Sequence, residues 1–107
     1  IQGWTPDFIP FVLQEDIDNN YFDKLLPFSG AQGTTWAKRI ARAEGIITGI
    51  SGGSTLAIAM EVAKQASKNS NILCMIPDTA ERYMSSVLFE DIEAEMNIKE
   101  QEIYNSV

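Results

Sequence analysis

Two stretches of the chain alternate polar and apolar side chains with the period of a helix. In residues 34–44 (TTWAKRIARAE) the small and apolar side chains form one stripe and the basic side chains lie elsewhere, which predicts an amphipathic helix. Gly45 follows directly and supplies the left-handed residue that ends many helices. Residues 53–67 (GSTLAIAMEVAKQAS) are small or apolar through their first two turns, so we expect a second helix whose start is buried.

Short apolar runs on either side of the second predicted helix have the length of strands. Residues 46–49 precede it and residues 71–77 (NILCMIP) follow it. A third run, residues 24–29 (KLLPFS), contains Pro27, which favours an edge position or the end of a strand. Strands that alternate with helices in this order favour an α/β layer with parallel strands.

The remaining segments predict shorter elements. Residues 11–17 form a short predicted helix that ends at the turn-forming residues 18–20 (DNN). Residues 78–83 (DTAERY) predict a turn at the end of a buried strand, and residues 91–102 predict a helical tail rich in acidic side chains.

The composition fits one ordinary domain, since 107 residues with 45% hydrophobic side chains can bury a core. The formal net charge of −7 argues against binding to nucleic acid or to an anionic membrane surface, because both need clustered Lys and Arg. No apolar run is long enough to cross a bilayer. The chain begins at Ile1 and not at Met, so we expect a fragment of a longer protein.

The single cysteine and the absence of histidine exclude several kinds of site for this chain. Cys74 is the single cysteine and cannot form an internal disulfide, so we expect it to fill space in a buried strand of a cytoplasmic, reducing-compartment protein. The chain has no histidine, which removes the Ser-His-Asp scheme and leaves no pattern typical of a metal site.

The glycine-rich segment 45–56 (GIITGISGGSTL) is the strongest candidate for a binding site. It runs from a predicted strand into a predicted helix, where α/β sheets place ligands, and Ser51 is the hydroxyl at the corner. Gly49, Gly52 and Gly53 permit unusual dihedrals or the close approach of a flat group. The spacing matches neither a Walker-type phosphate loop, a dinucleotide fingerprint nor a nucleophile elbow. From the residues alone, a helix N-cap is the simpler interpretation of Ser51 beside that of a ligand-binding hydroxyl.

Residues 78–83 are a second, weaker candidate. Their acidic side chains could form a carboxylate pair for acid–base chemistry. Turn formation by Asp78 and Thr79, with a contact between Arg82 and Glu81, accounts for most of the pattern without any catalytic role.

Three motifs in a fixed order, IQGWTPDFIP, ARAEGIITGISGGSTLAIA and IPDTAERYMSSVLFE, carry a family resemblance. They resemble the last third of a cysteine synthase (O-acetylserine sulfhydrylase), in the fold-type-II family of pyridoxal-phosphate enzymes. The resemblance implies an α/β fold in which the chain is part of a three-layer sheet domain, with mostly parallel strands and covering helices. It makes residues 1–92 the carboxyl-terminal portion of the cofactor-binding catalytic domain and residues 93–107 an acidic helix or tail.

The resemblance also assigns roles to individual residues. In this family the serine of the GIS-x-G turn hydrogen-bonds the pyridine nitrogen of pyridoxal 5′-phosphate, and that serine matches Ser51, with Gly49 beside it. A neutral hydroxyl does not hold a pyridinium proton as a carboxylate would, which suits β-elimination and β-replacement. By the same resemblance Pro77 and Asp78 border the ring pocket, and a loop in the first motif closes over the substrate. That loop begins with Gly3, Trp4 and Thr5.

The implied activity is the formation of L-cysteine from O-acetylserine and sulfide. The family's Schiff-base lysine and phosphate loop lie upstream of the matching part, so the chain alone is expected to be inactive and to need the remainder of the same enzyme. The family is dimeric, and its cysteine synthases often bind the carboxyl-terminal peptide of serine acetyltransferase. The resemblance therefore implies a homodimer and that peptide as partners, with no nucleic acid and no membrane.

Departures from the family pattern keep two rivals open. The sequence Trp4-Thr5-Pro6-Asp7 stands where typical cysteine synthases have I-G-A-G, and Ala80 stands where the family often has Gly. Residues 7–10 and 53–55 resemble cystathionine β-synthases, which condense serine with homocysteine, whereas residues 81–83 resemble cysteine synthases. A cystathionine β-synthase-like enzyme and a non-catalytic fragment that kept the fold are the alternatives.

Overall fold

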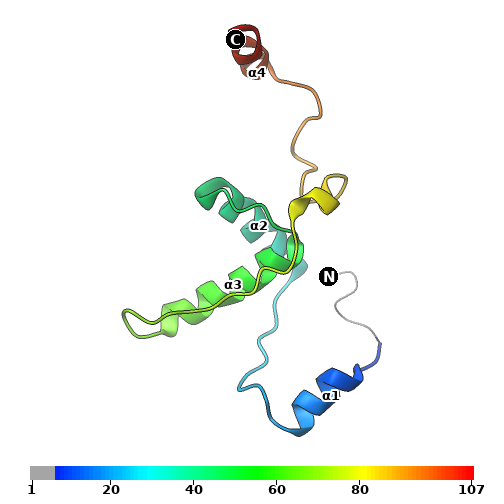
Figure 1. Cartoon of the computed structure of the whole chain (residues 1–107), viewed down its shortest axis with the longest axis vertical. Coiled ribbons are helices and arrows are strands. Elements are labelled where there is room, and N and C mark those ends of the chain that lie inside the picture. The colour runs from blue at the N-terminus through cyan, green and yellow to red at the C-terminus, as the bar shows by residue number, and fades with distance from the viewer. Residues whose placement is uncertain (1–6) are drawn as a thin grey trace.

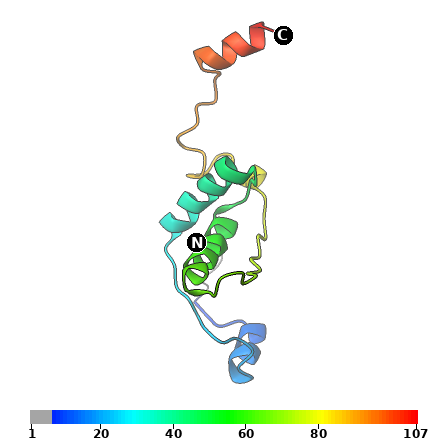
Figure 2. The same ribbon diagram turned by 90° about the vertical axis from the view of Figure 1, so that its left-hand side faces the viewer.

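The computed structural model describes residues 7–107 and shows a mainly helical chain (Figure 1). Its elements in order are α1 (Phe11–Asp18), α2 (Gly30–Glu44), α3 (Ile50–Gln65), the 3₁₀ helix η1 (Ala80–Tyr83) and α4 (Ile98–Asn105). Helices α2 and α3 pack together, whereas α1 and α4 lie at opposite ends of the long axis (Figure 1 and Figure 2). The Cα radius of gyration is 18.0 Å, against about 13 Å for a compact domain of this size, so much apolar surface stays open.

A capping box fixes the start of α2. The Ser29 hydroxyl accepts a hydrogen bond from the backbone N–H of Gln32, and the Gln32 side chain accepts one from the backbone N–H of Ser29 at 2.9 Å. The helix therefore begins at Gly30, before the predicted start at Thr34. At the other end, Gly45 has a φ of 69°, which confirms the predicted left-handed stop.

Glycines bring α2 and α3 into close contact. A Cβ on Gly53 would overlap the carbonyl oxygen of Gly33 and lie 2.6 Å from the backbone nitrogen of Ala37. Because neither glycine carries a side chain, the two backbones can approach at this point. The first turns of α3 are covered as a result, which confirms the prediction of a buried start. The buried residues of α3 are Ser51, Gly52, Gly53, Ser54 and Ala57.

The two end helices have no buried residues. Helix α1 confirms the predicted short helix, and its C-cap residue is Asn19, whose backbone N–H donates to the carbonyl oxygen of Glu15 at 3.0 Å. Helix α4 begins later than the predicted start at residue 91, because Asn97 and Glu100 form a capping box that sets its first turn.

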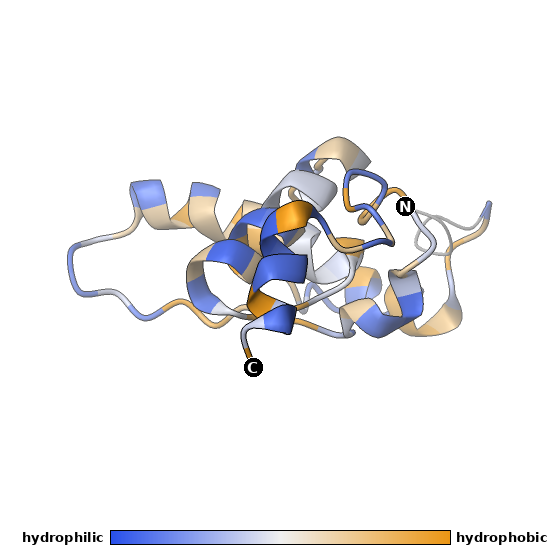
Figure 3. Cartoon of the chain, turned by 90° about the horizontal axis from the view of Figure 1, so that it is seen from above, coloured by the Kyte–Doolittle hydropathy of each residue, from blue (hydrophilic) through white to orange (hydrophobic). Residues whose placement is uncertain are grey.

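The predicted parallel sheet is absent from residues 7–107, and the expected strands 24–29, 46–49 and 71–77 are not formed there. The one pairing in this part of the chain is an isolated antiparallel bridge between Thr48 and Thr79. Apolar runs become strands only when neighbouring strands satisfy their backbone groups, and these runs have no such neighbours among the described residues. The apolar trace that follows α3, orange in Figure 3, instead runs beside that helix, where the Thr55 hydroxyl donates to the carbonyl oxygen of Met75 at 2.6 Å. Cys74 lies half-buried in this segment, outside any strand.

A small core joins η1 to the paired helices. It contains the buried residues Ala37, Ala80 and Leu88, against which the side chains of Ile50, Tyr83 and Phe89 pack. An ion pair at the edge of this core connects α2 to the segment after η1, since Lys38 Nζ lies 2.6 Å from Oδ1 of Asp91. No helix within residues 7–107 has the length and apolar character needed to cross a membrane.

Candidate functional site

Ser51 lies in the first turn of α3, directly after Ile50 begins the helix. Gly49 is the N-cap residue, with extended backbone, and no side chain caps the helix. The interpretation of Ser51 as an N-cap is therefore wrong. Ser51 is only 7% exposed, so its surroundings decide what that hydroxyl can bind.

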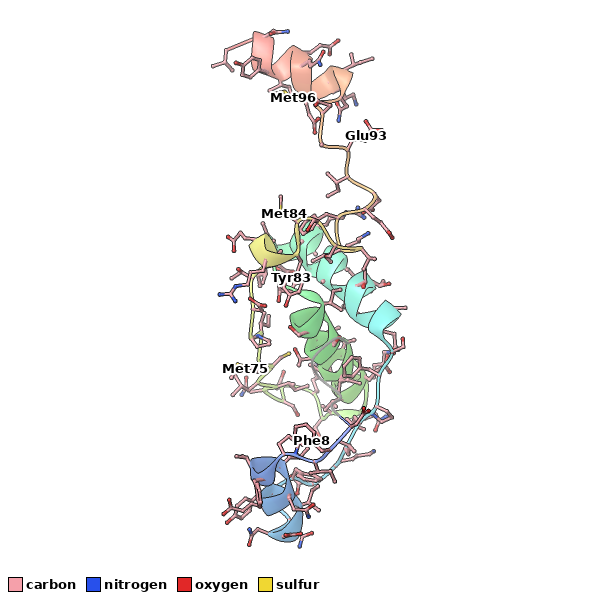
Figure 4. All side chains as sticks on the ribbon, turned by 90° about the vertical axis from the view of Figure 1, so that its right-hand side faces the viewer. Phe8, Met75, Tyr83, Met84, Glu93 and Met96 are labelled. Atoms are coloured by element: carbon pink, nitrogen blue, oxygen red, sulfur yellow. The ribbon has the colours of Figure 1, made fainter. Side chains whose placement is uncertain are left out.

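Tyr83 is the polar neighbour of Ser51. Its hydroxyl donates a hydrogen bond to Oδ2 of Asp78 at 2.7 Å, and the Ser51 hydroxyl has a small lowering effect on the pKa of Tyr83. Its ring packs on Gly49, where a Cβ would lie 2.5 Å from the ring carbon Cε2. Figure 4 shows Tyr83 beside the first turn of α3. We call Ser51, Tyr83 and Asp78 together the Ser51 cluster.

Asp78 is anchored through both its side chain and its backbone. Its Oδ1 accepts from the backbone N–H of Thr79 at 2.8 Å and lies 3.9 Å from Nε of Arg82. Its carbonyl oxygen accepts from the hydroxyl of the buried residue Thr48 at 2.9 Å. Because Thr48 also pairs with Thr79, the turn that carries Asp78 is attached to the segment leading into α3.

The cluster shifts the pKa values of its two acidic groups in opposite directions. The hydrogen bond from Tyr83 lowers the pKa of Asp78 below its ordinary value of 3.8, and the backbone N–H of Thr79 lowers it further. The same Tyr83–Asp78 bond raises the pKa of Tyr83 above 10.0, with partial burial adding to the rise and the Ser51 hydroxyl acting against it. At neutral pH Asp78 is therefore a carboxylate and Tyr83 a neutral phenol.

The space beside the glycines near Ser51 is occupied by other side chains of the same chain. The space beside Gly49 holds the ring of Tyr83, and a Cβ on Gly52 would overlap the Thr48 hydroxyl and lie 2.9 Å from Cγ2 of Ile76. These close approaches hold the start of α3 against the turn that carries Asp78. The glycine pattern is thus explained within the chain by packing.

The structure brings together three of the residues predicted for a cofactor site, namely Ser51, Gly49 and Asp78. Pro77 directly precedes Asp78 and is exposed. Gly3, Trp4 and Thr5, the predicted substrate loop, lie outside the described residues. Tyr83 was not predicted as a site residue. The signal that could have found it is an aromatic hydroxyl in the same turn as Asp78, a turn that must fold against the glycine corner.

The chemistry of the Ser51 cluster suits a neutral hydrogen-bond partner better than a nucleophile. The carboxylate of Asp78 is already bonded to Tyr83, and the group next to Ser51 is a neutral phenol, which is a poor base. The start of α3 has no side-chain cap and carries the positive end of the helix dipole, which favours an electron-rich atom such as an unprotonated ring nitrogen. The hydrogen bond from Ser51 to the ring nitrogen of pyridoxal phosphate stays a prediction, and the chemistry of the groups at this position is compatible with it. Within residues 7–107 no cluster of metal-ligating side chains could hold an ion.

Known proteins similar to this chain are amino-acid synthases. The chain is 39% identical over 93 residues to the O-ureido-L-serine synthase of Streptomyces lavendulae and 38% identical over 90 residues to a probable cysteine synthase of Bacillus subtilis (strain 168). These matches cover 87% and 84% of the chain but 28% of each relative, so the chain spans less than a third of their length.

A solved structure agrees with these relatives. The crystal structure of a mutant O-ureido-L-serine synthase with bound O-ureido-L-serine matches 98% of this chain and 32% of its own, with a TM-score of 0.82 and 34% identity. No family model matches the chain.

Proposed function

Because the chain belongs to the fold-type-II family of pyridoxal-phosphate enzymes that includes the cysteine synthases, we propose that it forms the carboxyl-terminal part of an enzyme making L-cysteine from O-acetylserine and sulfide. The reaction would be a β-replacement, in which sulfide takes the place of acetate on the β-carbon of the amino acid. We use "intact enzyme" below for this chain together with the remainder of a protein of the relatives' length.

The observation that carries the proposal is the buried hydroxyl of Ser51 at the uncapped start of α3. When bound, pyridoxal phosphate supplies an electron-withdrawing ring that stabilises negative charge at the substrate α-carbon. Ser51 would hold the ring nitrogen by a neutral hydrogen bond. That leaves the ring a moderate electron sink, which suits replacement at the β-carbon.

The remaining proposed site residues surround this hydroxyl. Gly49, which has no side chain of its own, accommodates the Tyr83 ring at the corner before Ser51, while Pro77 and Asp78 would form the border of the ring pocket. The loop Gly3–Asp7 would close over the substrate. The lysine that carries the cofactor and the loop that binds its phosphate would come from the remainder of the enzyme, in a homodimer that binds the carboxyl-terminal peptide of serine acetyltransferase.

A second candidate reaction is favoured by the relatives named O-ureido-L-serine synthase, one of which is 39% identical to this chain. That name describes a serine whose β-carbon carries a ureido group through oxygen. The same β-replacement chemistry would apply, with hydroxyurea as the nucleophile in place of sulfide.

Ser51 variants of the intact enzyme test the site. Ser51→Ala is expected to keep the lysine-bound cofactor but to weaken cofactor affinity about three- to tenfold and change the turnover, since one neutral hydrogen bond is lost. Ser51→Asp is expected to protonate the ring nitrogen and promote side reactions. The matched control is Ser54→Ala, because the Ser54 hydroxyl already donates a hydrogen bond to the carbonyl oxygen of Ile50 at 2.7 Å. Equal effects of Ser51→Ala and Ser54→Ala would refute the assigned role.

Loading and substrate assays separate the proposed reaction from its rivals. The intact enzyme mixed with pyridoxal phosphate should show the absorbance of a lysine-bound cofactor that borohydride fixes in place, and its absence would leave only the non-catalytic fragment. Turnover is then compared with sulfide, hydroxyurea and homocysteine as nucleophiles. The cysteine synthase proposal requires sulfide to be preferred, and a preference for homocysteine would identify a cystathionine β-synthase-like enzyme.

A further inference from the structure

A pocket of about 120 Å³ lies between α2 and the segment that follows η1, and Ser51 is not among the residues that line it. Its walls are mainly apolar and come from α2, from the segment before α3 and from the segment after η1. The apolar side chains that form them include Ala37, Ala41, Ile47, Leu88, Phe89 and Ile92. The two residues from α2 are alanines, so this side of the pocket is left open by short side chains.

The size of the pocket suits a short aliphatic group. An apolar cavity of about 150 Å³ holds benzene, so this slightly smaller pocket has room for a branched chain of about four carbon atoms. Ile47 and Ile92 line the pocket and are exposed to solvent. A bound aliphatic group would cover part of both side chains, and the removal of apolar surface from water favours its binding.

Three charged side chains of both signs line the same pocket, namely Lys38, Arg42 and Asp91. Lys38 Nζ lies 2.6 Å from Oδ1 of Asp91. Nη2 of Arg42 lies 3.9 Å from Oδ2 of the same carboxylate, which is too long for a hydrogen bond. The side chains of Arg42 and Asp91 are 76% and 48% exposed, so a ligand in the pocket can reach both of them.

We propose that this pocket binds a small branched-chain α-amino acid, with the aliphatic side chain against the apolar walls, the ammonium group on Asp91 and the carboxylate on Arg42. An amino acid carries a positive and a negative group beside its side chain, and the pocket presents the complement of each. The guanidinium of Arg42 can hold a carboxylate by two parallel hydrogen bonds, and Oδ2 of Asp91 accepts from an ammonium group. A ligand with one charge would leave one of these residues without a counterpart. The proposal does not depend on the reaction proposed above.

The test is a calorimetric titration of the intact enzyme with L-leucine. Borohydride first fixes any lysine-bound cofactor, so that the amino acid cannot bond to it. We expect saturable binding of one L-leucine per chain. Ala41→Leu fills the pocket and should abolish this binding. Ala43→Leu is the matched control, since Ala43 is an exposed residue of the same helix that does not line the pocket, and it should bind L-leucine as the wild type does.

Two analogues of L-leucine test the charged contacts separately. Isoamylamine lacks the carboxylate and isocaproate lacks the ammonium group, so each should bind about ten- to hundredfold more weakly than L-leucine. Asp91→Asn should weaken L-leucine and isoamylamine but not isocaproate. Arg42→Gln should weaken L-leucine and isocaproate but not isoamylamine. Arg39→Gln, at an exposed arginine over the Trp36 ring, is the matched control and should change none of the three affinities.

The titrations distinguish this pocket from any other site for L-leucine. No binding to the wild type, or equal binding to the Ala41→Leu and Ala43→Leu variants, overturns the proposal. So does a loss of affinity that is the same for all three ligands in Asp91→Asn and Arg42→Gln. Where Ala41→Leu does not fold, the pattern of these two charge variants decides. A protein that takes up no pyridoxal phosphate contradicts the proposed function alone, and its L-leucine titration still tests the pocket.

Discussion

Gly33 and Gly53 meet backbone to backbone where α2 crosses α3. A side chain on Gly53 would overlap the carbonyl oxygen of Gly33, and a side chain on Gly33 would overlap the hydroxyl of Ser54, so the close crossing needs glycine at both positions. Ser51 lies on the turn of α3 that this contact holds in place. The geometry of the candidate site thus depends on helix packing outside it.

Gly53→Ala is expected to destabilise the intact enzyme by about 1–3 kcal/mol, the usual cost of overpacking a close contact. The measurement is the free energy of unfolding in urea. Gly30→Ala is the matched control, since nothing lies within 4 Å of a Cβ at that helical glycine. It should be neutral or stabilising by up to about 1 kcal/mol. A loss that is the same for both variants would contradict the close helix crossing.

Thr48→Val is expected to cost about 1–3 kcal/mol of unfolding free energy, because it leaves the carbonyl oxygen of Asp78 without the Thr48 hydroxyl. Valine keeps the shape of the buried threonine, so the loss reports the hydrogen bond. Thr35→Val removes a hydroxyl from an exposed helical position and should stay within about 0.5 kcal/mol of the wild type. A neutral Thr48→Val would show that Thr48 does not anchor the Asp78 turn.

The Lys38–Asp91 ion pair is expected to make the attachment of residues 88–91 to α2 sensitive to acid. The hydrogen bond with Lys38 lowers the pKa of Asp91 below its ordinary 3.8. A depressed pKa stabilises the folded state above the unfolded-state value, and this contribution is lost as the pH falls from about 3.8 through the folded-state pKa. Amide hydrogen exchange of Leu88 should therefore be faster in Asp91→Asn than in the wild type at neutral pH, with the difference vanishing in acid. Glu90→Gln, at an exposed neighbour, is the control.

Tyr83 is expected to ionise above pH 10, because its hydrogen bond to Asp78 raises its pKa in the folded state. A raised pKa of this acid stabilises the folded state fully below the unfolded-state value near 10, and that contribution is lost as the pH rises through the folded-state pKa. The phenolate absorbance assigned to Tyr83, taken as wild type minus Tyr83→Phe, should move to lower pH in Asp78→Asn. An unchanged titration in that variant would disprove the Tyr83–Asp78 coupling.

The sequence predicts the helices well, whereas the parallel sheet that it predicts is not formed among the described residues. Helical period and the stop at Gly45 are local signals, so α2 and α3 follow from them. Both helices begin earlier than the predicted starts at residues 34 and 53, because the Ser29–Gln32 capping box sets the first turn of α2 and because α3 runs through the glycines that follow Gly49. Strands depend on neighbours elsewhere, which a local apolar run does not contain.

For the candidate site, the sequence pattern identifies the glycine corner and Ser51 but not the contact that surrounds them. A helix and an extended segment separate Ser51 from Tyr83 along the chain. How close the two residues lie therefore depends on how η1 folds back onto the start of α3. That placement is set by the Thr48–Thr79 bridge and by packing of Tyr83 on Gly49, both of them long-range contacts. No local periodicity reports such contacts.

Residues 71–77 combine the side-chain pattern of an inner strand with a backbone that joins no strand in the described part of the chain. Leu73 is fully exposed, at 101% of its reference area. An exposed apolar segment with unpaired backbone N–H and C=O groups is a template for pairing with another chain. In isolation the chain is therefore expected to pair with copies of itself through this segment and to aggregate.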